Sequence, residues 1–397
     1  MRAALIGLGL TLPPYPALAA ASGQTLEPLQ VSPVREGRLF SAEPASLLQI
    51  PMTEIACDGR PIQPLYADDL AIGVARNAYD RAAVVLTFSV DAQGRARDIR
   101  GAPAGPDAPS NPGVPIFIPR IGQAEDEQAA LAAWRFQGGP RVDCRATIRY
   151  SNRPLDAATT DDLLRYFAVT RTRGALREIV AKRLGGPGAD CGDGRGDRAP
   201  RTISVPDFTI GRRPPPGGRS WTVVRWNVDA AGRATDVETL GSSGDVDLDG
   251  EARRAISETV LRPGAPLTGC VFNFNRIGDT LTAPDMPAQA TDPQQSCPAD
   301  VSERLRLTIA PERFPPAFAK RRIEGWALVR FDLATWGQTG AIEVIDAQPS
   351  AVFGEDARRL VASARAEPAL TGAVRCVLPI RYRLPDANGT VADLATD

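Results

Sequence analysis

Six cysteines are the residues of this sequence with the clearest potential for chemistry. They are Cys57, Cys144, Cys191, Cys270, Cys297 and Cys376. No two lie close enough along the chain for a C-x-x-C redox motif or a zinc-binding pair. An even number of widely spaced cysteines is typical of disulfides, and six cysteines allow 15 pairings.

Histidine is absent from all 397 residues. This removes the most common general base, every histidine-dependent triad and every histidine metal ligand. The 46 Lys+Arg nearly balance the 47 Asp+Glu, so charge predicts neither a nucleic-acid-binding surface nor a polybasic membrane arm. We therefore predict a protein that is not an enzyme, with no catalytic residue, metal site, cofactor or nucleic-acid partner.

Two pairs of adjacent acids could in principle perform acid–base chemistry. Asp161 and Asp162 stand at the start of a predicted helix, where negative charge is favourable without any catalytic role. Asp68 and Asp69 have no evident partner in the sequence, so we expect them on a solvated surface.

Three stretches of the chain share one pattern of elements. Each contains a strand, a turn glycine, a second strand, a helix and a last strand that opens with a cysteine. The hairpins begin with residues 84–95, 222–233 and 327–338, the helices span 125–136, 249–261 and 355–364, and the last strands span 144–150, 270–275 and 376–382. We predict an α+β fold of three β-β-α-β units, each an antiparallel sheet with a helix on one face.

The remaining three cysteines each precede one of these units. Their distances to the cysteine of the last strand are 87, 79 and 79 residues. This near-constant spacing favours the pairs Cys57–Cys144, Cys191–Cys270 and Cys297–Cys376, with bridges between units as the alternative. Each bridge should stabilise its unit by about 4–5 kcal/mol through the entropy of the unfolded chain.

The first 19 residues have the features of a secretory signal peptide. Met1-Arg2 precedes an apolar run over 3–12, and Ala17-Leu18-Ala19 forms an A-x-A cleavage site. The alternative, an uncleaved membrane anchor, is disfavoured because the apolar run is about half of the ~20 residues needed to span a bilayer. We predict export to the periplasm and a mature chain without a transmembrane helix.

The predicted organisation contains three units joined by two connecting segments. The signal peptide spans 1–19, unit one 50–155, a helical connector 156–185, unit two 186–281, a linker 282–296 and unit three 297–397. The connector has the apolar spacing of a helix or helix pair, with Thr159 or Thr160 as its cap and Gly185 at its end.

Unit three resembles the TonB C-terminal domain family over residues 310–384. The matching residues are Phe314-Pro315-Pro316-Ala317, the strand 323–333, the turn Gly337, the helix residues Phe353 and Ala357, and Pro379-Ile380-Arg381-Tyr382. Units one and two resemble the family more weakly and lack the Phe-Pro-Pro-Ala entry. We interpret them as diverged copies of the same unit.

The resemblance implies a periplasmic module that binds an extended segment of an envelope partner of the outer-membrane receptor type. Full transducers of this family also carry an inner-membrane helix with an essential histidine, and neither is found here. The prediction is therefore a binding module. The alternatives are a membrane-anchored energy transducer for TonB-dependent transport, or a cell-wall-binding scaffold that uses Trp326 or Trp336.

The candidate partner-binding strand is the last one, Arg375–Arg383. An edge strand has unpaired N–H and C=O groups, and an added peptide strand satisfies them. Pro379 cannot donate a backbone hydrogen bond, which suits an edge, although it could equally serve to block aggregation. The predicted partner-binding residues are Arg375, Val377, Leu378, Ile380, Arg381 and Tyr382.

Overall fold

The computed structural model describes most of the chain beyond residue 46. The described residues are 47–75, 83–103, 124–170, 174–191, 202–206, 213–288, 294–297, 301, 305, 314–368 and 371–385. All of them belong to one compact unit, Pro44–Asp397. The predicted signal peptide over 1–19 lies outside the described residues.

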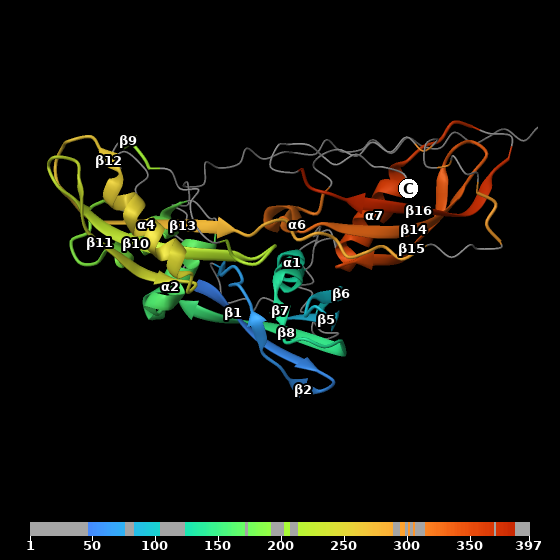
Figure 1. Cartoon of the computed structure of the whole chain (residues 1–397), viewed down its shortest axis with the longest axis horizontal. Coiled ribbons are helices and arrows are strands. Elements are labelled where there is room, and N and C mark those ends of the chain that lie inside the picture. The colour runs from blue at the N-terminus through green and yellow to red at the C-terminus, as the bar shows by residue number, and fades with distance from the viewer. Residues whose placement is uncertain are drawn as a thin grey trace, which may run out of the picture. The chain divides into compact units, whose positions relative to one another are not determined.

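The N-terminal part of this unit is built on a six-stranded antiparallel sheet (Figure 1). Its strands are β1 (Leu47–Cys57), β2 (Arg60–Pro61), β4 (Gly73–Ala75), β5 (Val84–Val90), β6 (Ala96–Pro103) and β8 (Arg141–Pro154). The order is β2-β1-β8-β5-β6, with β4 paired to β1. Helix α1 (Glu125–Ala133) contributes buried alanines and Leu131 to the core. A small second sheet pairs β3 (Pro64–Tyr66) with β7 (Arg135–Phe136).

Strand β1 is a feature that the sequence pattern does not predict. It pairs with β8 over its full length, from Leu47 opposite Pro154 to Cys57 opposite Cys144. The predicted hairpin strands β5 and β6 lie on the other side of β8. The outer side of β8 is thus occupied by a segment of the same chain.

The middle part has a three-stranded antiparallel sheet between two sets of helices. Its elements are β10 (Arg219–Val228), β11 (Ala234–Ser242), α4 (Val246–Glu258) and β13 (Leu267–Ile277), with sheet order β11-β10-β13. Val224 and Trp226 pack with residues of α4, whereas Trp221 and Val223 pack with residues of α2 (Thr160–Val169) and α3 (Ala175–Gly185). A short pair, β9 (Thr202–Ser204) and β12 (Val260–Leu261), lies beside this sheet, and a 3₁₀ turn (Leu155–Ala157) precedes α2.

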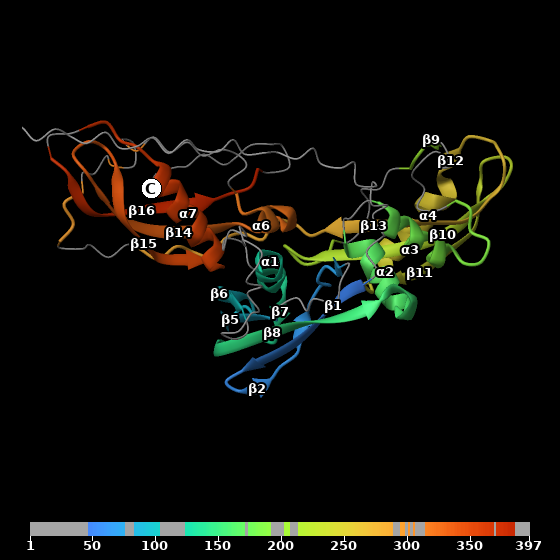
Figure 2. The same ribbon diagram turned by 180° about the vertical axis from the view of Figure 1, so that it is seen from behind.

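The C-terminal part has the sheet order β15-β14-β16 with one long helix (Figures 1 and 2). Its elements are α6 (Pro316–Arg321), β14 (Gly325–Leu333), β15 (Thr339–Gln348), α7 (Ala351–Ser363) and β16 (Ala373–Tyr382). Helix α7 covers one face of the sheet because Val329 and Phe331 alternate toward it. Phe353 of α7 contacts the rings of Phe318 and Tyr382, with centroids 4.7 and 5.1 Å away.

The three hairpin glycines predicted from the sequence have a conformation that only glycine adopts easily. Gly94, Gly232 and Gly337 have φ of 73°, 79° and 85°. Each one lies against a backbone carbonyl of the segment after the following helix, and a Cβ there would lie 2.0–2.3 Å from that oxygen. These glycines therefore fix both the turn and its contact with the helix end.

Helix α1 begins at Glu125 as predicted, whereas α4 and α7 begin earlier than the apolar pattern predicts, because capping residues decide their start. Asp245 accepts a hydrogen bond from the Leu248 N–H and caps α4, and Ser350 caps α7. The predicted connector contains two helices, α2 and α3. Thr159 and Asp162 form a capping box at the start of α2.

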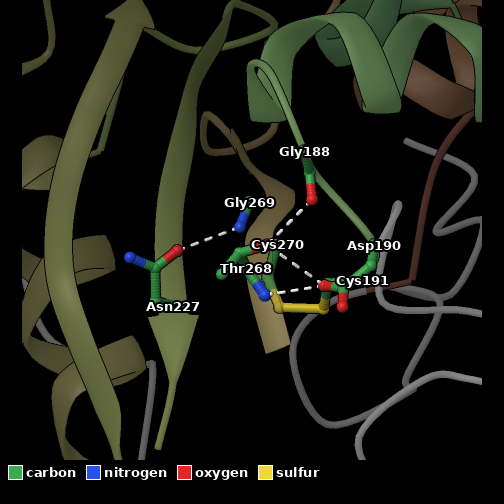
Figure 3. Close-up of a disulfide and its surroundings, with 7 residues drawn as sticks. All are labelled: Gly188, Asp190, Cys191, Asn227, Thr268, Gly269 and Cys270. Carbon is green, nitrogen blue, oxygen red and sulfur yellow. Dashed lines mark hydrogen bonds between the residues drawn. A yellow bond between two sulfur atoms is a disulfide. The ribbon is translucent and has the colours of Figure 1, made fainter. Parts of the chain in front are cut away.

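The six cysteines lie at disulfide distance in three pairs, Cys57–Cys144, Cys191–Cys270 and Cys297–Cys376. Figure 3 shows the second pair, where β13 meets the segment after α3. There the Thr268 N–H donates to the Asp190 carboxylate at 2.7 Å, and the Gly269 N–H donates to the Asn227 side chain at 2.9 Å. The bridge and these hydrogen bonds join the entry segment to the last strand.

The fold is therefore a mixed α+β fold with antiparallel sheets and three pairs of cysteines. Among the residues that the structure describes, no helix has the length and apolar character needed to cross a membrane.

Candidate functional site

The six residues predicted to bind a partner all lie on β16. Within the described part of the chain, β16 pairs with β14 alone. Its other side is an edge, where main-chain N–H and C=O groups have no neighbouring strand. In Figure 1 this strand runs beside β14, away from β15.

The side chains of β16 alternate between the core and the outer face of the sheet. Leu378, Ile380 and Tyr382 are 4%, 6% and 7% exposed and belong to the core under α7. The side chains of these three residues are therefore not available to a partner. Val377 is half-buried and Arg381 is exposed on the opposite face, so their side chains could contact an added strand.

Tyr382 anchors the end of β16 to α7. Its hydroxyl donates to the Asp356 carboxylate at 2.9 Å. Burial, reinforced by the negative charge of Asp356, raises the pKa of Tyr382 far above its ordinary value of 10.0. The phenol therefore stays neutral and remains a hydrogen-bond donor throughout the physiological pH range.

The first residues of β16 are already engaged. The Arg375 N–H donates to the Asp332 carboxylate at 2.8 Å, and Cys376 is bridged to Cys297. Val374 exchanges hydrogen bonds with Ser296 in both directions, at 3.0 and 3.2 Å. The open stretch of the edge therefore begins after Cys376.

At its other end, the edge reaches a cavity of about 600 Å³. The cavity is lined by Trp326 of β14, by Arg381 and Arg383, and by the segment 282–286. Trp326 is 3% exposed, and its indole N–H donates to the Pro284 carbonyl at 2.8 Å. By contrast, Trp336 is 68% exposed in the hairpin turn, so only Trp326 packs against the sheet.

The opposite side of the C-terminal sheet is partly engaged within the chain. The Ile99 N–H of β6 donates to the Pro349 carbonyl at 2.9 Å, just beyond the end of β15. The Ser350 hydroxyl lies 2.7 Å from the Gln128 side chain of α1. These contacts engage the segment just beyond the end of β15.

The sequence of the C-terminal part matches a known protein family. Residues 310–384 match the Gram-negative bacterial TonB protein C-terminal family. The match covers about a fifth of the chain and includes α6, β14, β15, α7 and β16. The TonB C-terminal family consists of protein-interaction domains of the bacterial envelope rather than enzymes. A comparison of the whole chain with curated proteins found no match.

The expectation that Asp68 and Asp69 lie on a solvated surface is wrong. Asp68 is 7% exposed, accepts a hydrogen bond from the Trp134 indole N–H at 3.1 Å and forms an ion pair with Arg321 of α6. Asp69 accepts a hydrogen bond from the Trp221 indole N–H at 2.8 Å. These partners are distant in sequence, so no local pattern could reveal them.

The neighbouring Tyr66 extends the same set of contacts. Its hydroxyl accepts the Arg219 N–H at 2.9 Å and donates to the Arg219 carbonyl at 3.0 Å. Burial, with a smaller contribution from the charge of Asp68, raises the pKa of Tyr66 well above its ordinary value of 10.0. The loop 66–69 therefore joins segments from all three parts of the chain.

Proposed function

We propose that this chain is an exported, non-enzymatic TonB-like protein that binds an extended segment of an envelope partner by strand addition at β16. The observation that carries the proposal is the open edge of β16 within the segment that matches the TonB C-terminal family. An outer-membrane receptor is the partner type that the family resemblance implies. Cleavage of the predicted signal peptide, residues 1–19 of this chain, would place the mature chain in the periplasm.

The main chain of β16 suits such an addition. Pro379 has no N–H, so its position fits the row of groups that points away from β14. Val377 and Arg381, two residues to either side, belong to the same row. An added strand would then find the N–H and C=O groups of Val377 and Arg381, together with the C=O of Pro379.

The N-terminal sheet supports the proposal because its last strand carries an added strand already. Strand β8 follows a hairpin and a helix, as β16 does, and β1 pairs with it along its outer side. The three sheets share further details that favour our interpretation as diverged copies. The residue before the last-strand cysteine has positive φ in each case, at Asp143, Gly269 and Arg375.

The contact between the last strand and the helix is also shared. The residue six positions after each last-strand cysteine reaches a carboxylate on the helix. The pairs are Tyr150–Glu127, Arg276–Glu251 and Tyr382–Asp356. We propose the boundaries 50–155, 186–281 and 297–397 for the three copies, with the helical connector at 156–185 and the linker at 282–296.

The test compares the full mature chain with its Val377→Pro variant in cross-linked pull-downs from envelope extract. Proline removes one outward N–H without removing a hydrogen bond to β14, so the fold should persist. Val377→Thr is the matched control, since it keeps both the N–H and a β-branched side chain. Trp336→Ala tests the exposed tryptophan as the alternative contact.

We expect the wild-type, Val377→Thr and Trp336→Ala chains to capture the same envelope protein, and Val377→Pro to lose it. Cross-linked fragments should place an extended segment of that protein beside Val377 and Arg381. Equal capture by Val377→Pro, with an unchanged thermal unfolding midpoint, would exclude the edge. Loss of capture by Trp336→Ala alone would favour the cell-wall or scaffold alternative.

A further inference from the structure

The middle sheet differs from the other two sheets in how well two residues of its last strand are buried. These residues stand two and four positions after the last-strand cysteine. They are Ala146 and Ile148 in the N-terminal sheet, Leu378 and Ile380 in the C-terminal sheet, and Phe272 and Phe274 in the middle sheet. The first four are between 0% and 6% exposed, whereas the two phenylalanines are only half-buried. The middle sheet therefore has the largest side chains at these positions and covers them least.

The two phenylalanines line a cavity of about 190 Å³ between β13 and α4. Their rings meet edge to face, with centroids 5.0 Å apart. The walls of the cavity also include Trp226 of β10, Ala255 and Ile256 of α4, and Val205 just beyond β9. Among the described residues that line the cavity, none is charged. An apolar cavity of about 150 Å³ stays dry in water and can hold a benzene-sized group, so this one has room for a single ring.

The segment after the first cysteine contributes to the core in the C-terminal part, but it has no comparable side chains in the middle part. Val301 and Leu305, four and eight positions after that cysteine, are 7% and 3% exposed and belong to the core. The corresponding positions of the middle part are Arg195 and Ala199, and residues 192–201 contain no apolar side chain larger than proline. The segment that helps to close the core in the C-terminal part therefore cannot do so in the middle part.

The surroundings of the cavity indicate what kind of molecule would fill it. Ile203 of β9, Val205 and Val260 of β12 are 63%, 70% and 48% exposed, so the short strand pair beside the cavity presents three apolar side chains to solvent. A free small molecule would leave this surface uncovered, whereas a polypeptide could cover it while one side chain enters the cavity. The cavity is also smaller than the roughly 300 Å³ at which sites for drug-sized ligands begin.

We propose that the cavity between α4 and β13 is a docking site that takes one apolar side chain, of the size of phenylalanine or leucine, from a partner polypeptide. The rest of the bound segment would cover Val205 and the strand pair beside it. This site is on a different sheet from β16 and does not depend on the function proposed there. Because no described residue that lines the cavity is charged, we expect the affinity to change little with salt.

The first measurement asks whether the cavity is open space in the folded chain. Ala255→Leu adds a larger side chain in the wall of the cavity, and filling an empty apolar cavity maintains or raises stability. Ala252→Leu is the matched control, because Ala252 is on the same helix, is 0% exposed and lies in packed core, where added volume is destabilising.

We expect the thermal unfolding midpoint of Ala255→Leu to equal or exceed that of the wild-type chain, and that of Ala252→Leu to fall by several degrees. An equal fall in both variants would mean that residues of this chain itself fill the cavity, and it would overturn the proposal.

The second measurement uses a displayed library of short random peptides selected on the full mature chain, with counter-selection on Ala255→Leu. The selected peptides are synthesised, and their binding is measured to the wild-type chain, to Ala255→Leu and to Ser257→Leu. Ser257 is exposed on the same helix, so its variant adds the same side chain outside the cavity. Val377→Pro is included to separate this site from β16.

We expect the selected peptides to share one Phe or Leu. Replacing that residue with Ala should weaken binding at least about tenfold, because the burial of most of an apolar side chain is lost. Ser257→Leu and Val377→Pro should bind the peptides as tightly as the wild-type chain does, at low and at high salt. Equal binding by Ala255→Leu, or the failure to select any peptide that distinguishes it, would overturn the docking site. Loss of binding by Val377→Pro would also overturn it, because the peptides would then bind at β16.

Discussion

Asp68 and Arg321 form an ion pair across 253 positions of the chain, with side chains that are only 2% and 5% exposed. The Trp134 indole N–H donates to the other oxygen of the same carboxylate at 3.1 Å. This contact ties α6, at the entry of the segment that matches the TonB C-terminal family, to the N-terminal part of the chain.

Asp68→Asn should lower the free energy of unfolding by about 3–5 kcal/mol, because it leaves the Arg321 charge buried without a counter-charge. Urea-induced unfolding would measure the change. The double variant Asp68→Leu with Arg321→Met should lower the free energy of unfolding much less, because no uncompensated charge remains buried.

An exposed ion pair supplies the control for this prediction. Arg254 and Glu258 of α4 are 40% and 51% exposed, so Arg254→Gln should change stability by less than about 0.5 kcal/mol. Similar losses in Arg254→Gln and Asp68→Asn would show that the buried pair has no special role.

The sequence predicts this fold well where the determinants are local. The turn glycines and the apolar period of the helices act within a short stretch of chain, and the cysteine pairs followed from a spacing that repeats along the chain. The addition of β1 to β8 depends instead on contacts about 90 to 100 residues apart, for example between Glu54 and Arg149. The surroundings of Asp68 depend on Trp134 and Arg321, and no property of the sequence near Asp68 distinguishes it from a solvated acid.

The sequence alone indicates which strand forms the candidate site, but not which of its side chains are exposed. The edge strand followed from the resemblance and from Pro379, both visible in the sequence. Which side chains face outward required the structure, because Leu378, Ile380 and Tyr382 turn out to belong to the core.

Asp162→Asn should destabilise the chain at neutral pH and lose this effect in acid. Burial would raise the pKa of Asp162, but hydrogen bonds from Thr159 and the charge of Arg153 outweigh it and hold the pKa below its ordinary value of 3.8. A depressed pKa stabilises the folded state above the ordinary value, and the gain disappears as pH falls through the folded-state value.

Urea unfolding of wild-type and Asp162→Asn chains over a range of pH would measure this dependence. The free energies of unfolding of the two chains should differ by about 1 kcal/mol at pH 7, as for loss of a helix cap. They should become equal below about pH 4. A constant difference down to acid pH would mean that the charge of Asp162 contributes nothing.

Gly337→Ala should destabilise the C-terminal part by about 2 kcal/mol or more. Its φ of 85° is unfavourable for alanine, and a Cβ would lie 2.0 Å from the Ala366 carbonyl oxygen. Gly340→Ala in the same hairpin is the matched control, because nothing lies within 4 Å of its Cβ position. Thermal unfolding should separate the two variants, and equal midpoints would contradict the tight turn.

Replacing both Cys297 and Cys376 with alanine should lower the free energy of unfolding by about 4.5 kcal/mol, since the bridge closes a loop over a sequence separation of 79 residues. The same bridge holds the entry segment at Val374, directly before the open stretch of β16. The double variant should therefore also show faster hydrogen exchange at the start of β16.

Replacement of both Cys191 and Cys270 is the matched control. It should lower the free energy of unfolding by a similar amount, because the sequence separation is also 79 residues, but it should leave hydrogen exchange in β16 unchanged. Equal acceleration in β16 by both double variants would mean that the bridge acts on the whole chain and not on the strand it joins.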